Sequence, residues 1–200
     1  RGRPWAQLVP VLAGIADALA VLHARGVVHR DLKPANVLVG DDGAPVLADF
    51  GLAATVGDTG APRGGSPFSM SPQQLDGRPP AVADDVYGFG ALAYELLCGY
   101  PPFYPDARPE RIHGEPPAPL PAHLAVPPAL ERLVLGCLAK EPQQRPATVA
   151  GVASGLRALA AAATEAAAVQ RPPIVELRPP PSADPAIDPQ WSRAPAPGPT

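Results

Sequence analysis

The sequence is poor in the residue types that mark several classes of protein. Its two cysteines, Cys98 and Cys137, lie far apart in apolar, helix-like segments, so we expect two buried free thiols rather than a disulfide. Together with the four histidines they show no zinc-ligand spacing, and the net charge of −3 gives no indication of a nucleic-acid partner. No run of 18 apolar residues occurs, so we expect no membrane-spanning segment within these 200 residues.

Proline is the residue in excess. It accounts for 31 of the 200 residues, and ten of these prolines lie in residues 170–200. We therefore predict a disordered proline-rich tail over residues 169–200, after an ordered domain over residues 1–168. The chain is 46% hydrophobic, which is enough for the core of that domain. For the tail, a passive linker is favoured over a ligand of SH3- or WW-like partners.

A first helix is predicted from apolar residues that recur at spacings of four and three. Pro10 cannot donate an interior helix hydrogen bond, so we expect the helix to begin near Val9 or to kink there. Gly26 suits a cap at its C-terminal end. The apolar positions are Leu8, Leu12, Ile15, Leu19 and Leu22.

Further helices and one hairpin follow along the chain. The segment Val82–Cys98 is apolar on all sides, as in a buried helix, and Gly99 ends it. We also predict a short helix near residues 109–112, a helix that starts near Pro128, and a last helix capped by Thr148.

The predicted β-hairpin joins two short apolar runs, Val37–Val39 and Val46–Ala48, across the turn residues 40–43. Residues 51–65 contain five glycines among small and polar residues, which predicts a mobile loop.

The most informative segments are two short motifs, His29-Arg30-Asp31-Leu32-Lys33-Pro34-Ala35-Asn36 and Asp49-Phe50-Gly51. Phosphoryl transfer requires a carboxylate that accepts the proton of the attacking hydroxyl, and a cation that offsets phosphate charge. Asp31 and Lys33 supply these two groups. It also requires oxygen ligands for Mg²⁺, which Asp49 and Asn36 supply. The motifs therefore predict a phosphoryl-transfer site.

These motifs resemble the catalytic loop and the metal-binding motif of the protein kinases, and the resemblance covers residues 5–165, the C-terminal lobe of that fold. It implies ATP and Mg²⁺ as cofactors, with Asp31 as the base and Lys33 as the phosphate contact. Asn36 and Asp49 would hold the metal, and Leu38 would lie beneath the adenine. A lysine two residues after the aspartate is typical of Ser/Thr kinases. Further segments match the family in order, at residues 65–73, 85–90, 99–103 and 145–146.

The resemblance also implies regulation through the loop that follows the metal-binding motif. Arg30 is similar to the arginine that binds a phosphorylated activation segment, and Thr55 and Thr59 are the candidate phosphorylation sites. Ser66 stands where a threonine is usual, and its hydroxyl would reach the catalytic aspartate and lysine.

The resemblance also implies that residues elsewhere in the chain hold the site in place. Asp85 would accept hydrogen bonds from the backbone of the catalytic loop, and His29 and Phe50 would form the lower half of a hydrophobic spine. The sequence departs from the family pattern at Gln73, where a glutamate usually pairs with the arginine matched by Arg145. Glutamine can hydrogen-bond there but cannot form the ion pair.

The expected fold is mainly α: a protein-kinase-like C-terminal lobe with a small β-hairpin at the catalytic cleft. The expected function is transfer of the ATP γ-phosphate to Ser or Thr hydroxyls of protein substrates. Only 28 residues precede His29, so we expect the N-terminal lobe, with its glycine-rich loop and nucleotide-binding lysine, to be absent and this chain alone to be inactive. The alternatives are a non-catalytic pseudokinase or scaffold fragment, and a binding module that uses the tail. We expect a cytoplasmic location, with a membrane anchor beyond Thr200 left open.

Overall fold

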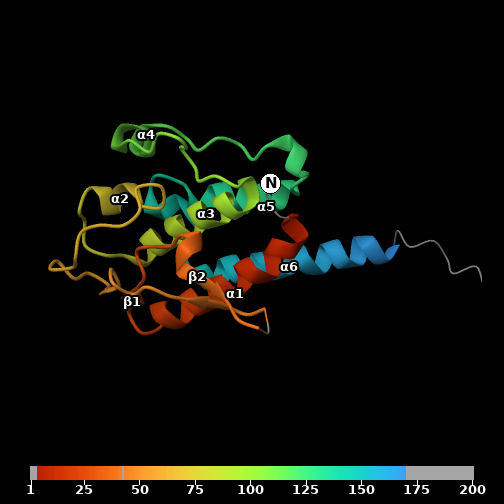
Figure 1. Cartoon of the computed structure of the whole chain (residues 1–200), viewed down its shortest axis with the longest axis horizontal. Helices are drawn as coiled ribbons and strands as arrows, with labels where there is room; N and C mark the ends of the chain where they lie inside the picture. The colour runs from red at the N-terminus through yellow and green to blue at the C-terminus, as the bar shows by residue number, and fades with distance from the viewer. Residues whose placement is uncertain (1–3, 42, 170–200) are drawn as a thin grey trace, which may run out of the picture. The chain divides into compact units, whose positions relative to one another are not determined.

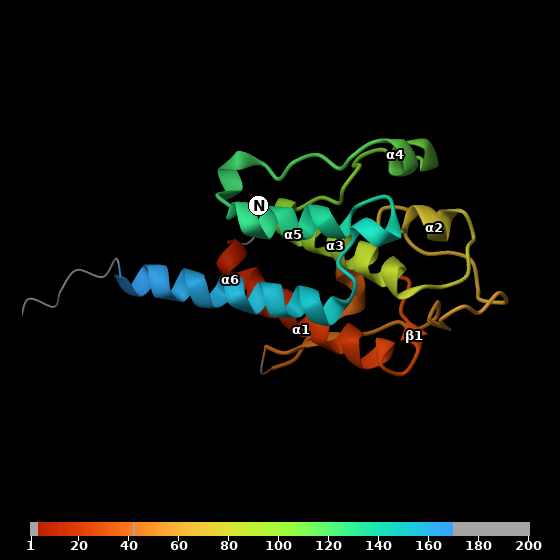
Figure 2. The same ribbon diagram turned by 180° about the vertical axis from the view of Figure 1, so that it is seen from behind.

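Long helices that pack on one another form the frame of the molecule (Figure 1). The computed structural model describes residues 4–41 and 43–169, so the predicted proline-rich tail lies outside the described residues. Helix α1 (Trp5–His23) contacts α3 (Val82–Cys98) and α6 (Val149–Val169), and α5 (Pro128–Cys137) contacts α3 and α6. Seen from behind, α6 runs along α1 while α5 lies along α3 (Figure 2). The mainly α fold expected from the sequence is confirmed.

The central helix α3 is buried on nearly all sides, as its composition predicts. Tyr87, Phe89 and Leu92 are each about 1% exposed. Gly90 permits close approach of α5, because a Cβ atom there would lie 2.7 Å from the Cβ of Cys137. Gly99 ends the helix in the left-handed conformation with φ of 83°, which glycine adopts at little cost.

Helix α1 begins earlier than the sequence predicts. It starts at Trp5 and includes Pro10, so the expected start near Val9 is wrong. Pro10 is exposed and lies in the second turn, where the helix loses one backbone hydrogen bond. Burial of the opposite face, which includes Leu12 and Ile15, offsets that loss. The C-cap of α1 is Ala24 rather than Gly26, although Gly26 does have a positive φ of 71°.

Two small antiparallel sheets border the helices. The predicted hairpin is confirmed as β2 (Val37–Val39) and β3 (Pro45–Leu47), with Val37 opposite Leu47. The second sheet, β1 (Val27–Val28) with β4 (Ala54–Thr55), was not predicted. Its strands have two residues each, which is too short for a sequence pattern. Part of the predicted mobile loop over residues 51–65 is therefore a paired strand.

The remaining elements agree with the sequence in type and position. The predicted short helix near residues 109–112 is α4 (Pro109–Gly114), and α5 starts at Pro128. Thr148 caps α6, since its Oγ1 accepts a hydrogen bond from the amide of Gly151 at 3.1 Å. Helix α2 and three short 3₁₀ segments complete the fold, at Pro72–Leu75, Pro34–Asn36, Ala122–Leu124 and Pro142–Gln144.

Cys98 and Cys137 are free, as expected, but only Cys137 is buried, and Cys98 is partly exposed. Burial raises the pKa of the Cys137 thiol to about 12. Two stretches, α1 and residues Pro142–Glu165, are long and apolar enough to cross a membrane by length and composition alone. Core helices of soluble proteins pass the same test. The expectation of no membrane-spanning segment therefore stays a prediction.

Candidate active site

The catalytic loop between β1 and β2 is held from below by a buried carboxylate of α3. Asp85, which is 1% exposed, accepts the backbone N–H of His29 and of Arg30, each at 2.8 Å. Arg30 has a φ of 70°, a conformation that costs a non-glycine residue free energy and persists only when its surroundings fix it. The expected role of Asp85 is confirmed, and the strained backbone directly precedes Asp31.

Three donors surround the carboxylate of Asp31. Oδ2 accepts hydrogen bonds from Nζ of Lys33 at 2.7 Å and from Nδ2 of Asn36 at 3.0 Å. Oδ1 accepts the backbone N–H of Ser66 at 3.1 Å. Asn36 is tied down a second time, because its Nδ2 also donates to the backbone carbonyl of Asp31 at 2.8 Å. The structure thus brings Asp31, Lys33 and Asn36 together with Ser66. Ser66 belongs to residues 65–73, the segment that matches the end of the family's activation segment.

These donors set the charge of the site. Burial by itself would raise the pKa of the Asp31 carboxyl, but the hydrogen bonds from Lys33, Ser66 and Asn36 outweigh burial and lower it. The same hydrogen bond raises the pKa of Lys33, with added attraction from the charges of Asp31 and Asp49. At neutral pH the pair therefore consists of a carboxylate and an ammonium ion. A carboxylate is the form that can accept a proton.

Ser66 contacts Asp31 through its backbone and not through its side chain. The sequence implies that the Ser66 hydroxyl reaches Asp31 and Lys33, but in the described part of the chain only its amide makes such a contact. Because a backbone amide makes this contact, it does not depend on which side chain stands at position 66.

Asp49 lies on the open side of the site. It is exposed, has a φ of 60°, and accepts the amide of Gly51 at 3.3 Å. Gly51 keeps space for the carboxylate, since a Cβ atom there would lie 3.2 Å from Oδ1 of Asp49. The amide oxygen of Asn36 accepts no hydrogen bond from any described residue. An accessible carboxylate and an amide oxygen are hard oxygen donors, so the chemistry of this pair suits Mg²⁺.

An apolar surface adjoins these oxygen donors. Leu38 is 57% exposed, and Val46, its partner in the hairpin register, is 52% exposed. Phe50 is half exposed and lies against the buried His29, with ring centroids 5.1 Å apart. The implied contact between His29 and Phe50 is therefore present.

The end of the activation segment is fixed by residues that the sequence analysis missed. Gln74 donates through Nε2 to the carbonyl of Arg30 at 2.9 Å and to that of Gly64 at 3.2 Å. Ser71 caps α2 and donates to Asp84 at 2.6 Å. An ordinary glutamine and an ordinary serine carry no sequence signal for such roles.

Gln73 forms a hydrogen bond but no ion pair with Arg145, as its side-chain chemistry predicts. Gln73 accepts a hydrogen bond from Nη2 of Arg145 at 2.6 Å and donates to the carbonyl of Lys140 at 2.9 Å. Arg145 is 5% exposed and also donates to the carbonyls of Ala83 and Ala139. The anchor is thus a network of hydrogen bonds in place of an ion pair.

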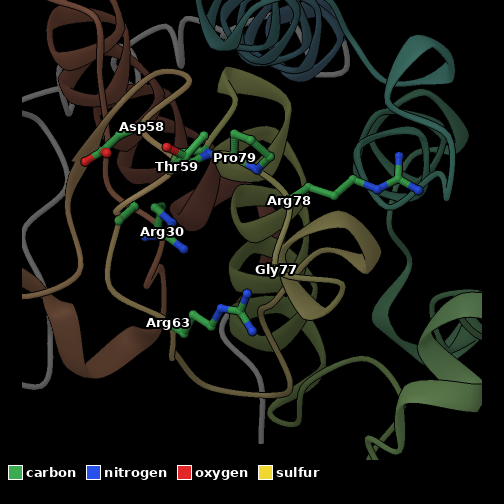
Figure 3. A pocket seen from close by; sticks show the side chains of 9 residues that line it. Arg30, Asp58, Thr59, Arg63, Gly77, Arg78 and Pro79 are labelled. Atoms are coloured by element: carbon green, nitrogen blue, oxygen red, sulfur yellow. The ribbon is translucent and has the colours of Figure 1, made fainter.

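A hollow of about 270 Å³ lies beside Arg30, and Figure 3 shows the side chains that line it. We call it the arginine hollow. Arg30 donates to the carbonyl of Pro62 at 2.7 Å, while its Nε is buried without a partner in the described chain. The guanidinium of Arg63 packs over Gly77, where a Cβ atom would lie 3.1 Å from it. The lining residues are Arg30, Asp58, Thr59, Ala61, Arg63, Gly77, Arg78, Pro79 and Pro80.

A second hollow lies beside Lys33. It is lined by Lys33, Pro34, Ala35, Ser66, Phe68, Glu95 and Pro101. An incoming side chain in this hollow would lie beside the Asp31–Lys33 pair. The site therefore combines a charged proton acceptor with room for a second reactant.

Comparison with known proteins agrees with this geometry. The family profile described as "Protein kinase domain" matches residues 5–155.

The chain belongs to the protein kinase family.

Three similar kinases from bacteria illustrate the relationship. The chain is 43% identical over 165 residues to the serine/threonine-protein kinase PkaA of Streptomyces coelicolor, which covers 76% of this chain and 30% of that protein. It is 38% identical over 162 residues to PknL of Mycobacterium tuberculosis, covering 76% of this chain and 40% of PknL. Identity to PknB of Mycolicibacterium smegmatis is 34% over 158 residues, which is 74% of this chain and 25% of PknB. The chain thus spans less than half the length of the curated kinases it matches.

Proposed function

We propose that this chain carries the catalytic face of a kinase that transfers the γ-phosphate of ATP to Ser or Thr hydroxyls of proteins. The observation that carries the proposal is the Asp31 carboxylate, which is held by three donors and adjoins a hollow open to a second reactant. The names of the related kinases support the choice of Ser and Thr.

The chemistry follows from the charges. The hydroxyl of the substrate loses its proton to Asp31 as its oxygen forms a bond to the γ-phosphorus, and the bond between that phosphorus and the β,γ-bridging oxygen breaks to release ADP. Lys33 offsets negative charge on the transferred group. Asp49 and the amide oxygen of Asn36 would hold Mg²⁺, which neutralises phosphate charge when bound.

The direct test is a phosphorylation assay with [γ-³²P]ATP and the full-length protein, followed by phosphoamino-acid analysis. We expect phosphoserine and phosphothreonine. Phosphotyrosine alone would refute the substrate class. An absence of any transfer, with ATP still bound, would favour the pseudokinase alternative.

Residues 1–200 by themselves should be a poor enzyme. Leu38, Val46 and Phe50 form the apolar side of the nucleotide site and lie open to solvent, so a bound nucleotide would contact protein on one side. We propose that this polypeptide binds Mg²⁺–ATP no better than about 1 mM, transfers no measurable phosphate and self-associates through this face. Calorimetry that gave micromolar affinity would contradict this.

Regulation by phosphorylation is also part of the proposal, with Thr55 and Thr59 as the candidate residues. Thr59 lines the arginine hollow together with Arg30 and Arg63, whereas Thr55 is paired to Val27 in the small sheet. A phosphate on Thr59 would give the buried Nε of Arg30 an acceptor.

We therefore expect Thr59→Ala to lower activity more than Thr55→Ala. Mass spectrometry should find phosphate on peptides that contain Thr59. Unchanged activity of the double variant, with no phosphate on the loop, would count against this regulation.

Because ATP is the proposed phosphate donor, we also propose that this domain lies in the cytoplasm, which cell fractionation would test.

A further inference from the structure

Gln74, in the short helix α2, places its side-chain amide between the catalytic loop and the end of the activation segment. Its Nε2 donates to the backbone carbonyl of Arg30 at 2.9 Å and to that of Gly64 at 3.2 Å. The residue is 6% exposed, so these contacts are shielded from water. Backbone carbonyls can only accept, which assigns the nitrogen of the side-chain amide to this position and uses both of its hydrogens.

The first carbonyl belongs to the peptide unit that joins Arg30 to Asp31. A peptide unit is planar, so a hydrogen bond at its oxygen also fixes the direction in which the chain enters Asp31. On the opposite edge of this plane, the N–H of Asp31 faces Nδ1 of His29 at 3.4 Å. Because that contact is long, the shorter hydrogen bond from Gln74 is the stronger restraint on the plane.

The second carbonyl belongs to Gly64, two residues before Ser66. Ser66 donates its amide to Oδ1 of Asp31 at 3.1 Å. The intervening Gly65 has a φ of 126°, and a Cβ atom there would lie 3.3 Å from Nε2 of Gln74. Glycine thus leaves room for the side-chain amide. One amide group therefore holds both the backbone that carries Asp31 and the backbone that donates to it.

The helix that carries Gln74 is fixed to the core. The hydroxyl of Ser71, which is fully buried, accepts the amide of Gln74 at 3.0 Å and donates to Oδ1 of Asp84 at 2.6 Å. Asp84 lies in the first turn of α3 and also accepts the amide of Ala81 at 2.9 Å. The side-chain amide of Gln74 thus extends from a rigid support, so little conformational entropy opposes its two hydrogen bonds.

We propose that Gln74 is a positioning residue for Asp31 in phosphoryl transfer. Its amide fixes the peptide unit that precedes Asp31 and keeps the amide of Ser66 within reach of the carboxylate. Gln74 lines neither the hollow beside Lys33 nor the exposed nucleotide side, so it acts on the chemical step through Asp31 and not through binding of the nucleotide. The kinetic part of this proposal rests on the proposed kinase function.

The test compares Gln74→Met and Gln74→Glu in the full-length protein. Methionine has the same length as glutamine but carries no donor. Glutamate keeps the shape but directs a carboxylate at two carbonyl oxygens. The matched control is Gln7→Met, because Gln7 is an exposed glutamine of α1 whose side chain forms no hydrogen bond within the described residues.

We expect Gln74→Met to lower kcat about tenfold, since two hydrogen bonds to the backbone are lost, with KM for ATP within about twofold. Gln74→Glu should lower kcat further, because its carboxylate leaves both carbonyl oxygens unpaired and repels them. Gln7→Met should match the unsubstituted protein. A kcat of Gln74→Met within about twofold of that control, or a loss confined to KM for ATP, would overturn the proposal.

A second readout does not depend on catalysis. The amide of Ser66 is protected by its hydrogen bond to Asp31, so its hydrogen exchange should be several-fold faster in both Gln74 variants than in Gln7→Met, at equal folded fraction by circular dichroism. Unchanged exchange would overturn the proposal. Loss of the fold in both variants would also overturn it, because Gln74 would then serve stability and not positioning. If the unsubstituted protein transfers no phosphate, the proposed function fails, and the exchange comparison still decides the role of Gln74.

Discussion

The two sides of the site are built in different ways. On the proton-accepting side, Asp31 and Asn36 are 5% and 4% exposed and are held by hydrogen bonds to the helical core and the activation segment. On the nucleotide side, Asp49 is exposed, and the neighbouring Leu38 and Phe50 are about half exposed. One side is preorganised by the fold, whereas the other becomes buried only when something binds to it.

This difference shows where substitutions should affect the reaction. Changes on the buried side should lower the rate of the chemical step, because in the proposed reaction Asp31 and its donors act in the transition state. Changes of the apolar side chains on the open side should weaken nucleotide binding and leave the fold intact, because those side chains are about half exposed in the free protein. Asp49 is the exception on that side, since as a metal ligand it would also act on the chemical step.

The largest effect should come from Asp31, the carboxylate proposed to accept the proton. In the full-length protein Asp31→Asn should lower kcat roughly 10³-fold, since an amide of the same shape cannot accept the proton. Asp49→Asn should also lower kcat by orders of magnitude, by removing the charged metal ligand. Near-normal turnover of either variant in a [γ-³²P]ATP assay would refute its assignment.

Lys33→Met should have the next largest effect and should also change the titration of Asp31. The hydrogen bond from Lys33 is the strongest of the influences that lower the pKa of Asp31. Without it that pKa rises, although the hydrogen bonds from Ser66 and Asn36 still lower it, so Asp31 loses its charge at a higher pH than in the unsubstituted protein. Activity should therefore fall off earlier as the solution is acidified. Carbon-13 NMR of the Asp31 carboxyl would measure the shift, and an unchanged pKa would contradict this account.

Leu38→Ala tests the open side. It should raise KM for ATP several-fold, as expected for about 1 kcal/mol of lost apolar contact with the base, without lowering the melting temperature. Val39→Ala is the matched control, because Val39 is equally exposed and adjacent strand residues point to opposite faces. Equal effects of the two variants would show that β2 does not lie beneath the base.

The smallest effect concerns the surface pair His113–Asp76, which has no part in the proposed reaction. The hydrogen bond to the Pro109 carbonyl, and then Asp76, raise the pKa of His113 in the folded state. The stabilisation is therefore complete below the unfolded pKa of about 6.5 and is lost as pH rises through the higher folded value. Because the pair is exposed, the stabilisation should be small. Urea unfolding should give a free energy of unfolding that is higher at pH 5.5 than at pH 8.5 by about 0.5 kcal/mol or less from this pair, and that contribution should be absent in His113→Gln.

The sequence by itself determined the helices with strong apolar patterns, the hairpin and the candidate reacting groups. Helix α3 matches its predicted bounds, because its composition and Gly99 act within the segment itself. Asp31, Lys33 and Asn36 could be assigned because a local motif places them within one loop.

Only the tertiary structure decided which groups from distant segments support that loop. His23, Gln74 and Asp85 come from three different elements, and each reaches the catalytic loop or its anchor through packing of helices that are far apart in sequence. The two-residue strands β1 and β4 likewise exist only as a pair. A side chain whose role depends on a long-range contact carries no periodic or local signal, so the contact becomes visible only when the chain has folded.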